Sequence, residues 1–323
     1  MSPLPLERVL PGVSKLVQGC MGLGGGWNAN PVGSADVRQA HAVVDAALEA
    51  GIDLFDHADI YTFGKAETVF GTVLRERPAL REQIRIQSKC GIRFADDAGP
   101  KRYDLSAEWI LRSVDGSLER LGIEQLDALL LHRPDPLMDA DEIAGAFEAL
   151  RVSGKVRHFG VSNMHAHQLR QLQAAVTEPL VANQIEMSLG ALAWLEEGVL
   201  AGQPAGAEIG FTAGTVEYCR EAGIQLQAWG ALCQGLFTGQ SLEAEHDRVR
   251  ATAKCVVELA ADYGTSREAI VLGFLLRHPA RIQPVIGTTD PDRIARCARA
   301  TDLALSREDF YRLYETARGA ELP

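Results

Sequence analysis

Short apolar runs alternate with amphipathic segments along nearly all of this chain, and this alternation is what most restricts its fold. Runs such as residues 52–55, 84–88 and 126–131 are each followed by a segment with the spacing of an amphipathic helix. With residues 18–24 as the opening strand, we expect eight strand–helix units. Repeated units of this kind form a parallel sheet with right-handed crossovers. Eight of them predict an α/β fold, the closed (β/α)8 TIM barrel.

Two helices in a row precede the eighth strand, whereas a simple strand–helix repeat has one helix between strands. Residues 245–264 and 266–278 have helical spacing, the strand follows at 282–287, and residues 306–319 form a last helix. We therefore expect a TIM barrel with additional helices before strand 8 and at the C-terminus. Because no linker divides the chain, residues 1–323 are predicted to form a single domain.

An open, doubly wound parallel sheet is the rival fold. It usually carries a GxGxxG turn after its first strand, and the run MGLGGGW at residues 21–27 lacks that spacing. The sequence also contains no GxxxxGK(S/T) loop. The closed barrel is therefore the better prediction. Residues 201–210, AGQPAGAEIG, are interpreted as a flexible surface loop and not as a boundary between domains.

Composition and charge argue against some classes of binding partner, namely nucleic acids and membranes. The chain is 46% hydrophobic and 23% charged, as in ordinary globular proteins, and its net charge of -11 argues against nucleic-acid binding. No apolar run approaches the ~20 residues of a membrane span, and the N-terminus does not resemble a signal peptide. The six cysteines are far apart, without CxxC or zinc spacing. We expect a cytoplasmic protein with free thiols, a small-molecule substrate, and neither a nucleic-acid nor a membrane partner.

Four polar residues lie at or just beyond the ends of apolar strand runs in the first half of the chain. They are Asp56 and Tyr61 in IDLFDHADIY, Lys89 in IRIQSKCG, and His132 in LDALLLHRPDP. Residues at the carboxyl ends of successive parallel strands converge at one mouth of a barrel. A carboxylate, a phenol, an amine and an imidazole gathered there are typical of a site for proton transfer.

These four residue types suggest a division of roles. Tyr61 can hold a proton at neutral pH, since a free phenol has a pKa of about 10, and can release it to a developing alkoxide. Lys89 would make that release easier by stabilising phenolate, and Asp56 would keep Lys89 charged. His132 could donate a hydrogen bond to a carbonyl oxygen. The neighbouring His57 is expected to point behind the site.

Other chemistries fit the residues less well. Asp56, Asp59 and Glu67 are possible metal ligands, but histidine partners and ligand spacing are missing, so no metal is expected. A Ser-His-Asp hydrolase would show a GxSxG elbow, which does not occur, and Ser162 lies in a GVSN turn. An isomerase or aldolase with Lys89 as a Schiff base stays open as a minor alternative.

The sequence resembles the aldo-keto reductase family. Its motifs occur in the family's order and cover nearly the whole chain: GIDLFDHADIY, SKCG, LLLHRPD, GKVRHFGVSN, NQIE and VIGTTDPDRI. The resemblance implies a (β/α)8 barrel that reduces carbonyl groups with NADPH or, less often, NADH. It also implies that Asp56, Tyr61, Lys89 and His132 form the catalytic tetrad, with Tyr61 as proton donor.

The same resemblance implies a set of cofactor-binding residues. Ser162, Asn163 and Gln184 would hydrogen-bond the nicotinamide carboxamide, and Trp229 would stack on the nicotinamide ring. The loop of residues 230–236 would meet the pyrophosphate, and phosphate groups would bind after strand 8. The residues implied for these two contacts are Gly230, Leu232, Gly287, Thr288 and Arg293.

Three positions depart from the family pattern. Many relatives have lysine where Gly287 stands, Glu-Asn where Arg296 and Cys297 stand, and Thr or Cys where His57 stands. The first two departures concern the adenine end of the cofactor. Arg293 and Arg296 could neutralise a 2′-phosphate, so we expect NADP to be preferred, with NAD as a possible cofactor.

The residues leave the substrate open. Trp27, from the loop after the first strand, is predicted to line the pocket together with Met187 and Leu189, which favours apolar or aromatic carbonyls and leaves sugars possible. The segment 187–215 could close over the cofactor. The main hypothesis is an NADPH-dependent reductase of aldehydes or ketones. The alternative is an NADPH-binding regulatory subunit with slow turnover; oligomeric state and reaction direction are not encoded in any motif.

Overall fold

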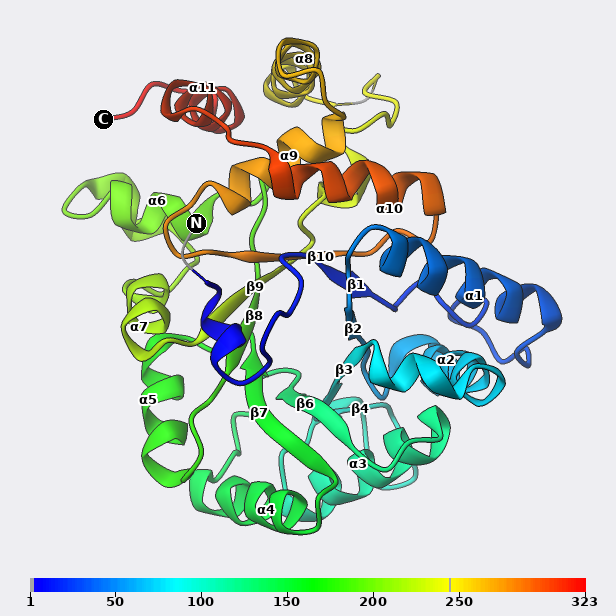
Figure 1. Ribbon diagram of the computed structural model, residues 1–323. Helices are drawn as coiled ribbons and strands as arrows, with labels where there is room; N and C mark the ends of the chain where they lie inside the picture. The colour runs from blue at the N-terminus through cyan, green and yellow to red at the C-terminus, as the bar shows by residue number, and fades with distance from the viewer. Residues whose placement is uncertain (1–2, 244) are drawn as a thin grey trace.

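Eight parallel strands close into a barrel in the computed structural model, which describes residues 3–243 and 245–323. Their order around the barrel is β1–β10–β9–β8–β7–β6–β3–β2, and helices surround them (Figure 1). This confirms the predicted (β/α)8 fold. The strands are β1 (Val17–Gly19), β2 (Leu54–Asp56), β3 (Arg85–Cys90), β6 (Leu126–Leu131), β7 (Val156–Ser162), β8 (Ala182–Glu186), β9 (Gln225–Trp229) and β10 (Gln283–Ile286).

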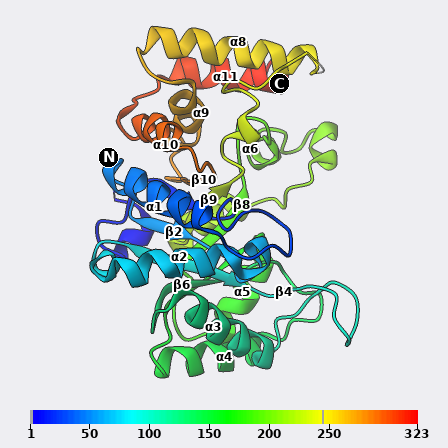
Figure 2. The ribbon, with the colours of Figure 1, turned by 90° about the vertical axis from the view of Figure 1, so that its right-hand side faces the viewer.

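The helices connect the strands and cover the outside of the barrel. As predicted, α8 and α9 both precede β10, the eighth barrel strand, and α11 ends the chain. Figure 2 shows α8 and α11 side by side, outside α9 and α10. The helices are α1 (Ser34–Glu49), α2 (Lys65–Glu76), α3 (Ala107–Leu121), α4 (Ala140–Val152), α5 (Ala166–Ala175), α6 (Ala193–Val199), α7 (Thr215–Ala222), α8 (Asp247–Asp262), α9 (Arg267–Leu276), α10 (Pro291–Ala298) and α11 (Arg307–Arg318).

Local sequence signals set the ends of these elements, as α3 illustrates. Ser106 precedes the helix, and its side chain accepts a hydrogen bond from the backbone N–H of Trp109 at 3.3 Å. Gly122 ends the helix in the left-handed conformation, with φ of 66°. Between these caps, the apolar positions of α3 face the barrel, and the following strand β6 is buried along its whole length.

The N-terminal segment closes one end of the barrel. It contains a 3-10 helix, η1 (Pro5–Arg8), and its side chains Leu6 and Leu10 are 1% and 4% exposed. They pack with Val17 and Leu54, the first residues of β1 and β2. In Figure 1 this dark blue segment crosses the barrel opening that faces the viewer. The catalytic candidates lie at the opposite ends of the strands, which leaves that end free for a site.

Two local expectations need correction. The opening strand ends at Gly19 and does not extend to residue 24, because the chain turns directly after it, where the N–H of Leu23 donates to the carbonyl oxygen of Cys20 at 3.1 Å. Residues 201–210 are not wholly irregular, since they contain the 3-10 helix η4 (Pro204–Glu208). The segment 187–215 includes the helix α6, in which Trp194 packs against His278, and its closure over a cofactor stays a prediction.

The strand order places the candidate residues next to one another. β2, β3 and β6 are neighbours in the barrel, so Asp56 and Lys89 lie on adjacent strands and His132 directly follows the third. No helix in the described part of the chain combines the length and apolarity needed to cross a membrane.

Candidate active site

Lys89 is at the centre of the candidate site. Its Nζ atom donates hydrogen bonds to Asp56 Oδ2 at 2.7 Å, to the hydroxyl oxygen of Tyr61 at 2.9 Å, and to the carbonyl oxygen of His57 at 2.9 Å. The Lys89 side chain has no exposed surface and Asp56 is 2% exposed. Burial alone would lower the pKa of Lys89, but attraction to Asp56 and Tyr61 outweighs it and leaves that pKa raised. The amine therefore stays charged.

Tyr61 begins a short 3-10 helix, η2 (Tyr61–Gly64), that follows β2. Burial raises the pKa of its phenol, and Lys89 opposes this only in part, so the net direction is upward. This differs from the expectation that Lys89 would make the phenol more acidic than usual. The physical reason is that removal of water from a buried phenolate costs more than one neighbouring ammonium returns. Tyr61 is therefore protonated at neutral pH.

His132 stands across from Tyr61. The two rings are 5.9 Å apart between centroids and nearly perpendicular. Burial, together with the charges of Lys89 and Arg133, lowers the pKa of His132 well below its usual value, so the imidazole is neutral. Its Nδ1 atom is buried and lacks a hydrogen-bond partner among the described residues. A neutral ring in this place can donate one hydrogen bond without bringing a second positive charge beside Lys89.

A network of glutamines supports Asp56 from inside the barrel, and the sequence interpretation named only one of them, Gln184, for a different role. Gln87 Nε2 and Gln184 Nε2 donate to Asp56 Oδ1 at 2.6 and 3.1 Å. Gln227 Oε1 accepts from the same two nitrogens, and Gln227 Nε2 donates to Gln283 Oε1 at 3.0 Å. The available signal was a glutamine inside the strand runs that became β3, β8, β9 and β10, because a buried amide must be hydrogen-bonded to be tolerated.

Two further ionisable residues lie behind the four candidate residues. His57 points away from the site, as expected, and packs against Phe70 of α2 with ring centroids 4.6 Å apart. Burial, and secondarily Lys89, lowers the pKa of His57 to about 3. Asp59 is also buried, and burial together with the charge of Glu67 raises its pKa to about 7.

Glu67 takes part in a different network from Asp56. Its Oε1 accepts from the hydroxyl of Ser88 at 2.6 Å, and its Oε2 accepts from Arg120 of α3 at 2.8 Å. Both carboxylates thus have protein partners of their own. Within residues 3–243 and 245–323, no cluster of His, Cys, Asp and Glu has the arrangement of a metal site.

The predicted nicotinamide residues lie together at the ends of β7, β8 and β9. Trp229 Nε1 donates to Asn163 Oδ1 at 3.0 Å, and Asn163 Nδ2 donates to Ser162 Oγ at 2.8 Å. The Ser162 hydroxyl donates in turn to the carbonyl oxygen of Gln184 at 2.7 Å. The indole of Trp229 is thus held at its edge while its ring is only partly buried. The amide nitrogen of Gln184 is already bonded to Asp56, inside the barrel.

The predicted phosphate-binding residues come from the loops after β9 and β10. Gly230 is exposed with a φ of 69°, and Leu232 is 8% exposed. Gly287 and Thr288 follow β10, and the carbonyl oxygen of Thr288 accepts a hydrogen bond from Gln18 at 3.0 Å. These residues therefore line one side of the barrel mouth, next to the Trp229 group.

Arg293 of α10 reaches back to the loop after β9. Its guanidinium donates to Thr238 Oγ1, and its Nε atom lies 3.4 Å from Glu268 Oε1. Arg296 Nε lies 3.2 Å from the same carboxylate oxygen, which belongs to a residue only 5% exposed at its side chain. One buried carboxylate thus orients both arginines that the sequence suggested for a 2′-phosphate.

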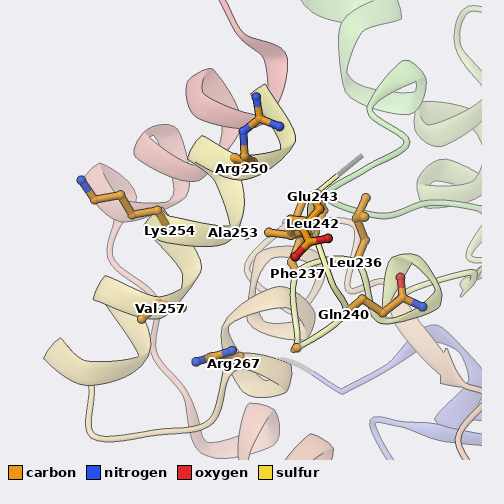
Figure 3. A pocket seen from close by; sticks show the side chains of 11 residues that line it. Leu236, Phe237, Gln240, Leu242, Glu243, Arg250, Ala253, Lys254, Val257 and Arg267 are labelled. Atoms are coloured by element: carbon orange, nitrogen blue, oxygen red, sulfur yellow. The ribbon is translucent and has the colours of Figure 1, made fainter. Parts of the chain in front are cut away.

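A cavity of about 480 Å³ lies beyond this loop, between it and α8. Its floor is apolar, and its rim carries Arg250 and Lys254 of α8 and Arg267 of α9 (Figure 3). Gln240 lines the cavity, and a Cβ placed on Gly235 would lie within 4 Å of both Gln240 and Arg293. The cavity is therefore continuous with the loop that Arg293 contacts.

The expected substrate-pocket residues do not share one environment. Trp27 is 48% exposed at the barrel mouth. Met187 and Leu189, in contrast, have no exposed surface and belong to the main hydrophobic core. The prediction that they line the pocket is therefore wrong, because both side chains turn inward at the end of β8.

A comparison with models of known protein families identifies the family to which this chain belongs. The model of the family described as "Aldo/keto reductase family" matches residues 15–318. The chain belongs to the aldo/keto reductase family. Membership makes it an oxidoreductase of the class that reduces carbonyl groups with nicotinamide cofactors.

Individual relatives align with this chain over almost the whole length of both proteins. A 6-dehydroglucose reductase of Agrobacterium fabrum is 38% identical over 295 residues, which cover 89% of this aldo/keto reductase and 91% of the relative. An uncharacterised oxidoreductase of Bacillus subtilis, YcsN, is 35% identical over 302 residues, 92% and 94% of the two chains. A crystal structure of a thermostable aldo-keto reductase with the inhibitor epalrestat shows the same fold, with a TM-score of 0.74, 24% identity, and coverage of 94% and 95%.

Proposed function

We propose that this aldo/keto reductase reduces aldehydes or ketones to alcohols with NADPH, and that Tyr61 donates the proton. The observation that carries this proposal is the position of Lys89 Nζ, which bonds Asp56 and the Tyr61 hydroxyl at once. The Tyr61 phenol keeps its proton before the reaction, and the Lys89 ammonium would stabilise the phenolate that forms when the proton is given up. Such a phenol is suited to act as a general acid. Relatives named as reductases and oxidoreductases favour an enzyme over a regulatory subunit.

The chain's own residues supply proton transfer and orientation. Tyr61 gives its proton to the oxygen of the substrate as negative charge develops there, and Lys89 stabilises the resulting phenolate. Neutral His132 donates a hydrogen bond to the same oxygen and so orients the carbonyl. Asp56 keeps Lys89 charged and in place. Bound NADPH would supply the hydride from nicotinamide C4.

The residues at the ends of β7 to β10 suit a dinucleotide. Trp229 offers a partly open ring whose edge is fixed by Asn163, which is what stacking on a flat heterocycle requires. Ser162, Asn163 and the side-chain oxygen of Gln184, whose amide nitrogen is bonded to Asp56, would hold the carboxamide. The exposed glycines Gly230 and Gly287 and the partly buried Thr288, with Leu232 in the same loop system, would face the phosphates. Arg293 would bind the 2′-phosphate.

The first substrate class to examine is a sugar aldehyde. A relative that is 38% identical is named as a 6-dehydroglucose reductase, and Trp27 presents an exposed aromatic ring at the mouth of this barrel. Aromatic rings bind the apolar faces of other ring systems. An aldehyde carried on a sugar ring is thus our proposed starting substrate, with aromatic aldehydes tested beside it.

The Tyr61→Phe variant tests the proton donor. It removes one oxygen and leaves the ring that packs beside His132, so the fold should be unchanged. We expect single-turnover reduction at saturating NADPH to slow about 100-fold or more, the usual contribution of a general acid. The matched control is Tyr103→Phe, which removes a hydroxyl from an exposed tyrosine on the hairpin after β3. Near wild-type chemistry in the Tyr61 variant would refute the assigned role.

A further inference from the structure

Five buried polar side chains meet inside the barrel. Asp56 of β2 is paired in register with Gln87 of β3, and Gln227 of β9 is paired with both Gln184 of β8 and Gln283 of β10. None of the five is more than 2% exposed. Large apolar side chains ordinarily fill the interior of such a barrel, and a buried amide is tolerated only when it is hydrogen-bonded. We call the four amides the glutamine network and ask what they do for Asp56.

One end of the glutamine network is a backbone carbonyl, which can only accept a hydrogen bond. Gln283 Nε2 donates to the carbonyl oxygen of Ser14 at 2.7 Å, so Gln283 turns its Oε1 toward the next amide. Gln227 Nε2 donates to that oxygen at 3.0 Å, which leaves Gln227 Oε1 as an acceptor. Because an amide has one donor end and one acceptor end, each of these bonds fixes the orientation of the next amide.

The other end of the network is the carboxylate of Asp56, which also only accepts. Gln227 Oε1 accepts from Gln87 Nε2 at 2.9 Å and from Gln184 Nε2 at 3.1 Å. The same two nitrogens donate to Asp56 Oδ1 at 2.6 and 3.1 Å, and Asp56 Oδ2 accepts from Lys89 Nζ at 2.7 Å. A reversed amide would place its oxygen against the carboxylate and repel it. Both ends of the network therefore require the same direction.

Two other buried glutamines in the barrel do not share this complete pairing. Gln18 of β1 and Gln225 of β9 each donate to two backbone carbonyl oxygens. Their Oε1 atoms are buried and have no hydrogen-bond partner among the described residues, whereas no atom of the glutamine network is left in that state. The barrel thus tolerates the free-energy cost of an unpaired amide oxygen elsewhere. Full pairing is found in the group that bonds Asp56.

We propose that Gln227 and Gln283 are positioning residues for the reduction. Neither of them is hydrogen-bonded to Asp56 in the described part of the chain, so they act through their neighbours. Gln283 orients Gln227, and Gln227 orients Gln87 and Gln184 so that both nitrogens face the carboxylate. This inference rests on the proposed reductase activity and adds residues to it that contact neither the substrate nor the cofactor.

The effect on the reaction passes through Lys89. With Oδ1 held by two amides, Asp56 keeps Oδ2 on Lys89 Nζ, and the same Nζ donates to the Tyr61 hydroxyl at 2.9 Å. Hydrogen bonds to a carboxylate favour its charged form, and a charged Asp56 stabilises the Lys89 ammonium. Loss of the orientation should therefore slow proton transfer from Tyr61.

Gln227→Met tests the centre of the network, because it removes the amide and keeps the length of the side chain. The matched control is Gln225→Met in the same strand, an equally buried glutamine that bonds only backbone carbonyls. Both variants leave buried polar groups unpaired, so both should unfold at lower urea concentration. We expect Gln227→Met to slow single-turnover reduction of benzaldehyde at saturating NADPH about tenfold or more, and the control to stay within about twofold of the wild type.

Gln227→Glu tests the direction of the network. A buried carboxyl group tends to keep its proton, and in that form it again donates to Gln283 Oε1 while it accepts from Gln87 and Gln184. At about pH 6 we therefore expect Gln227→Glu to react within about threefold of the wild-type rate. A rate as low as that of Gln227→Met would contradict the assigned orientation. If Gln227→Met does not fold, Gln283→Met takes its place and must slow the same step more than Gln225→Met does.

A measurement without cofactor or substrate separates this inference from the proposed function. In protein isotope-labelled at the side-chain nitrogen of glutamine, NMR follows solvent exchange of the amide protons of Gln87 and Gln184. Exchange should be slow in the wild type and in Gln225→Met, and about tenfold faster or more in Gln227→Met, because hydrogen bonding protects these protons.

The two kinds of failure give different results. A wild-type enzyme that reduces no aldehyde would refute the proposed function and leave the exchange comparison intact as the test of orientation. The positioning role is overturned if Gln227→Met and Gln225→Met slow single turnover alike, or if Gln227→Met reacts at the wild-type rate. Equally slow amide exchange in all three proteins would overturn it as well.

Discussion

A lysine without exposed surface would ordinarily lose its proton, and Lys89 keeps it because two partners face it. Asp56 and Tyr61 both lie within 2.9 Å of its Nζ atom. Removing one partner of such a buried pair leaves an uncompensated charge, which typically costs about 3–5 kcal/mol. The same burial keeps Tyr61 protonated and His132 neutral. The protonation states at the site thus depend on the balance between desolvation and the hydrogen bonds of Lys89 to Asp56, Tyr61 and the carbonyl oxygen of His57.

His57 gives the pH prediction. Its pKa is about 3 in the folded protein and about 6.5 when unfolded, so the unfolded chain binds more protons between these values. Stability is therefore full above the unfolded pKa and falls as the pH drops through that range. For His57→Thr, we expect the loss of unfolding free energy between about pH 8 and about pH 5 to be smaller than in the wild type by about 2 kcal/mol.

Urea unfolding at both pH values measures this difference. Any packing cost of the smaller threonine is the same at each pH and cancels in the comparison. His132 and His278 also have lowered pKa values, so part of the acid destabilisation should remain in the variant. An unaltered pH dependence would show that His57 does not stay neutral and buried.

The packing of α2 on α3 is the contact between helices that bears most directly on the site. Arg120 of α3 bonds Glu67 of α2, which bonds Ser88 beside Lys89. Gly71 permits the close approach, because a Cβ there would lie 2.2 Å from the carbonyl oxygen of Arg120. We therefore regard this helix pair as the support of β3 at the position of Lys89.

Gly71→Ala tests this support. The added methyl group must push α2 and α3 apart, so we expect the free energy of unfolding to fall by about 1–3 kcal/mol. The matched control is Gly145→Ala in α4, where a Cβ would meet nothing within 4 Å. There alanine should stabilise the helix by about 0.5–1 kcal/mol. If both variants shift stability alike in denaturant titrations, the close approach is not what makes Gly71 necessary.

At the scale of the whole molecule, the expected 2′-phosphate site depends on segments far apart in the sequence. Thr238 comes from the loop after β9, Glu268 from α9 and Arg293 from α10, and closure of the barrel brings them together. The cavity of Figure 3 lies beyond the same loop. Cofactor preference should therefore depend on this assembly and not on a single motif.

Arg293→Ala is expected to raise the Kd of NADPH about tenfold or more, the effect of losing a charge-assisted hydrogen bond. The Kd of NADH should stay close to its wild-type value, since NADH lacks the 2′-phosphate. Quenching of tryptophan fluorescence on titration with each cofactor measures both constants. Arg299→Ala, which removes a nearby arginine that bonds the carbonyl of Gly264, is the control. Equal weakening of the two cofactors would contradict the assigned contact.

Local patterns in the sequence determined much of the architecture. The caps Ser106 and Gly122 and the alternation of apolar runs predict helices and strands close to those observed, because such signals act within a few residues. The juxtaposition of Asp56, Lys89 and His132 was also predictable. It follows from one rule, that parallel strands end on the same side of a barrel.

Tertiary structure decided what depends on partners distant in the chain. The glutamines that hold Asp56, the inward turn of Met187 and the net upward shift of the Tyr61 pKa each result from contacts across the barrel. The contacts of Phe63 with Trp27 and Phe94 likewise needed three loops brought to one end of the barrel. Sequence spacing reports which residues share a face of one element, whereas desolvation and long-range hydrogen bonds arise only when the barrel closes.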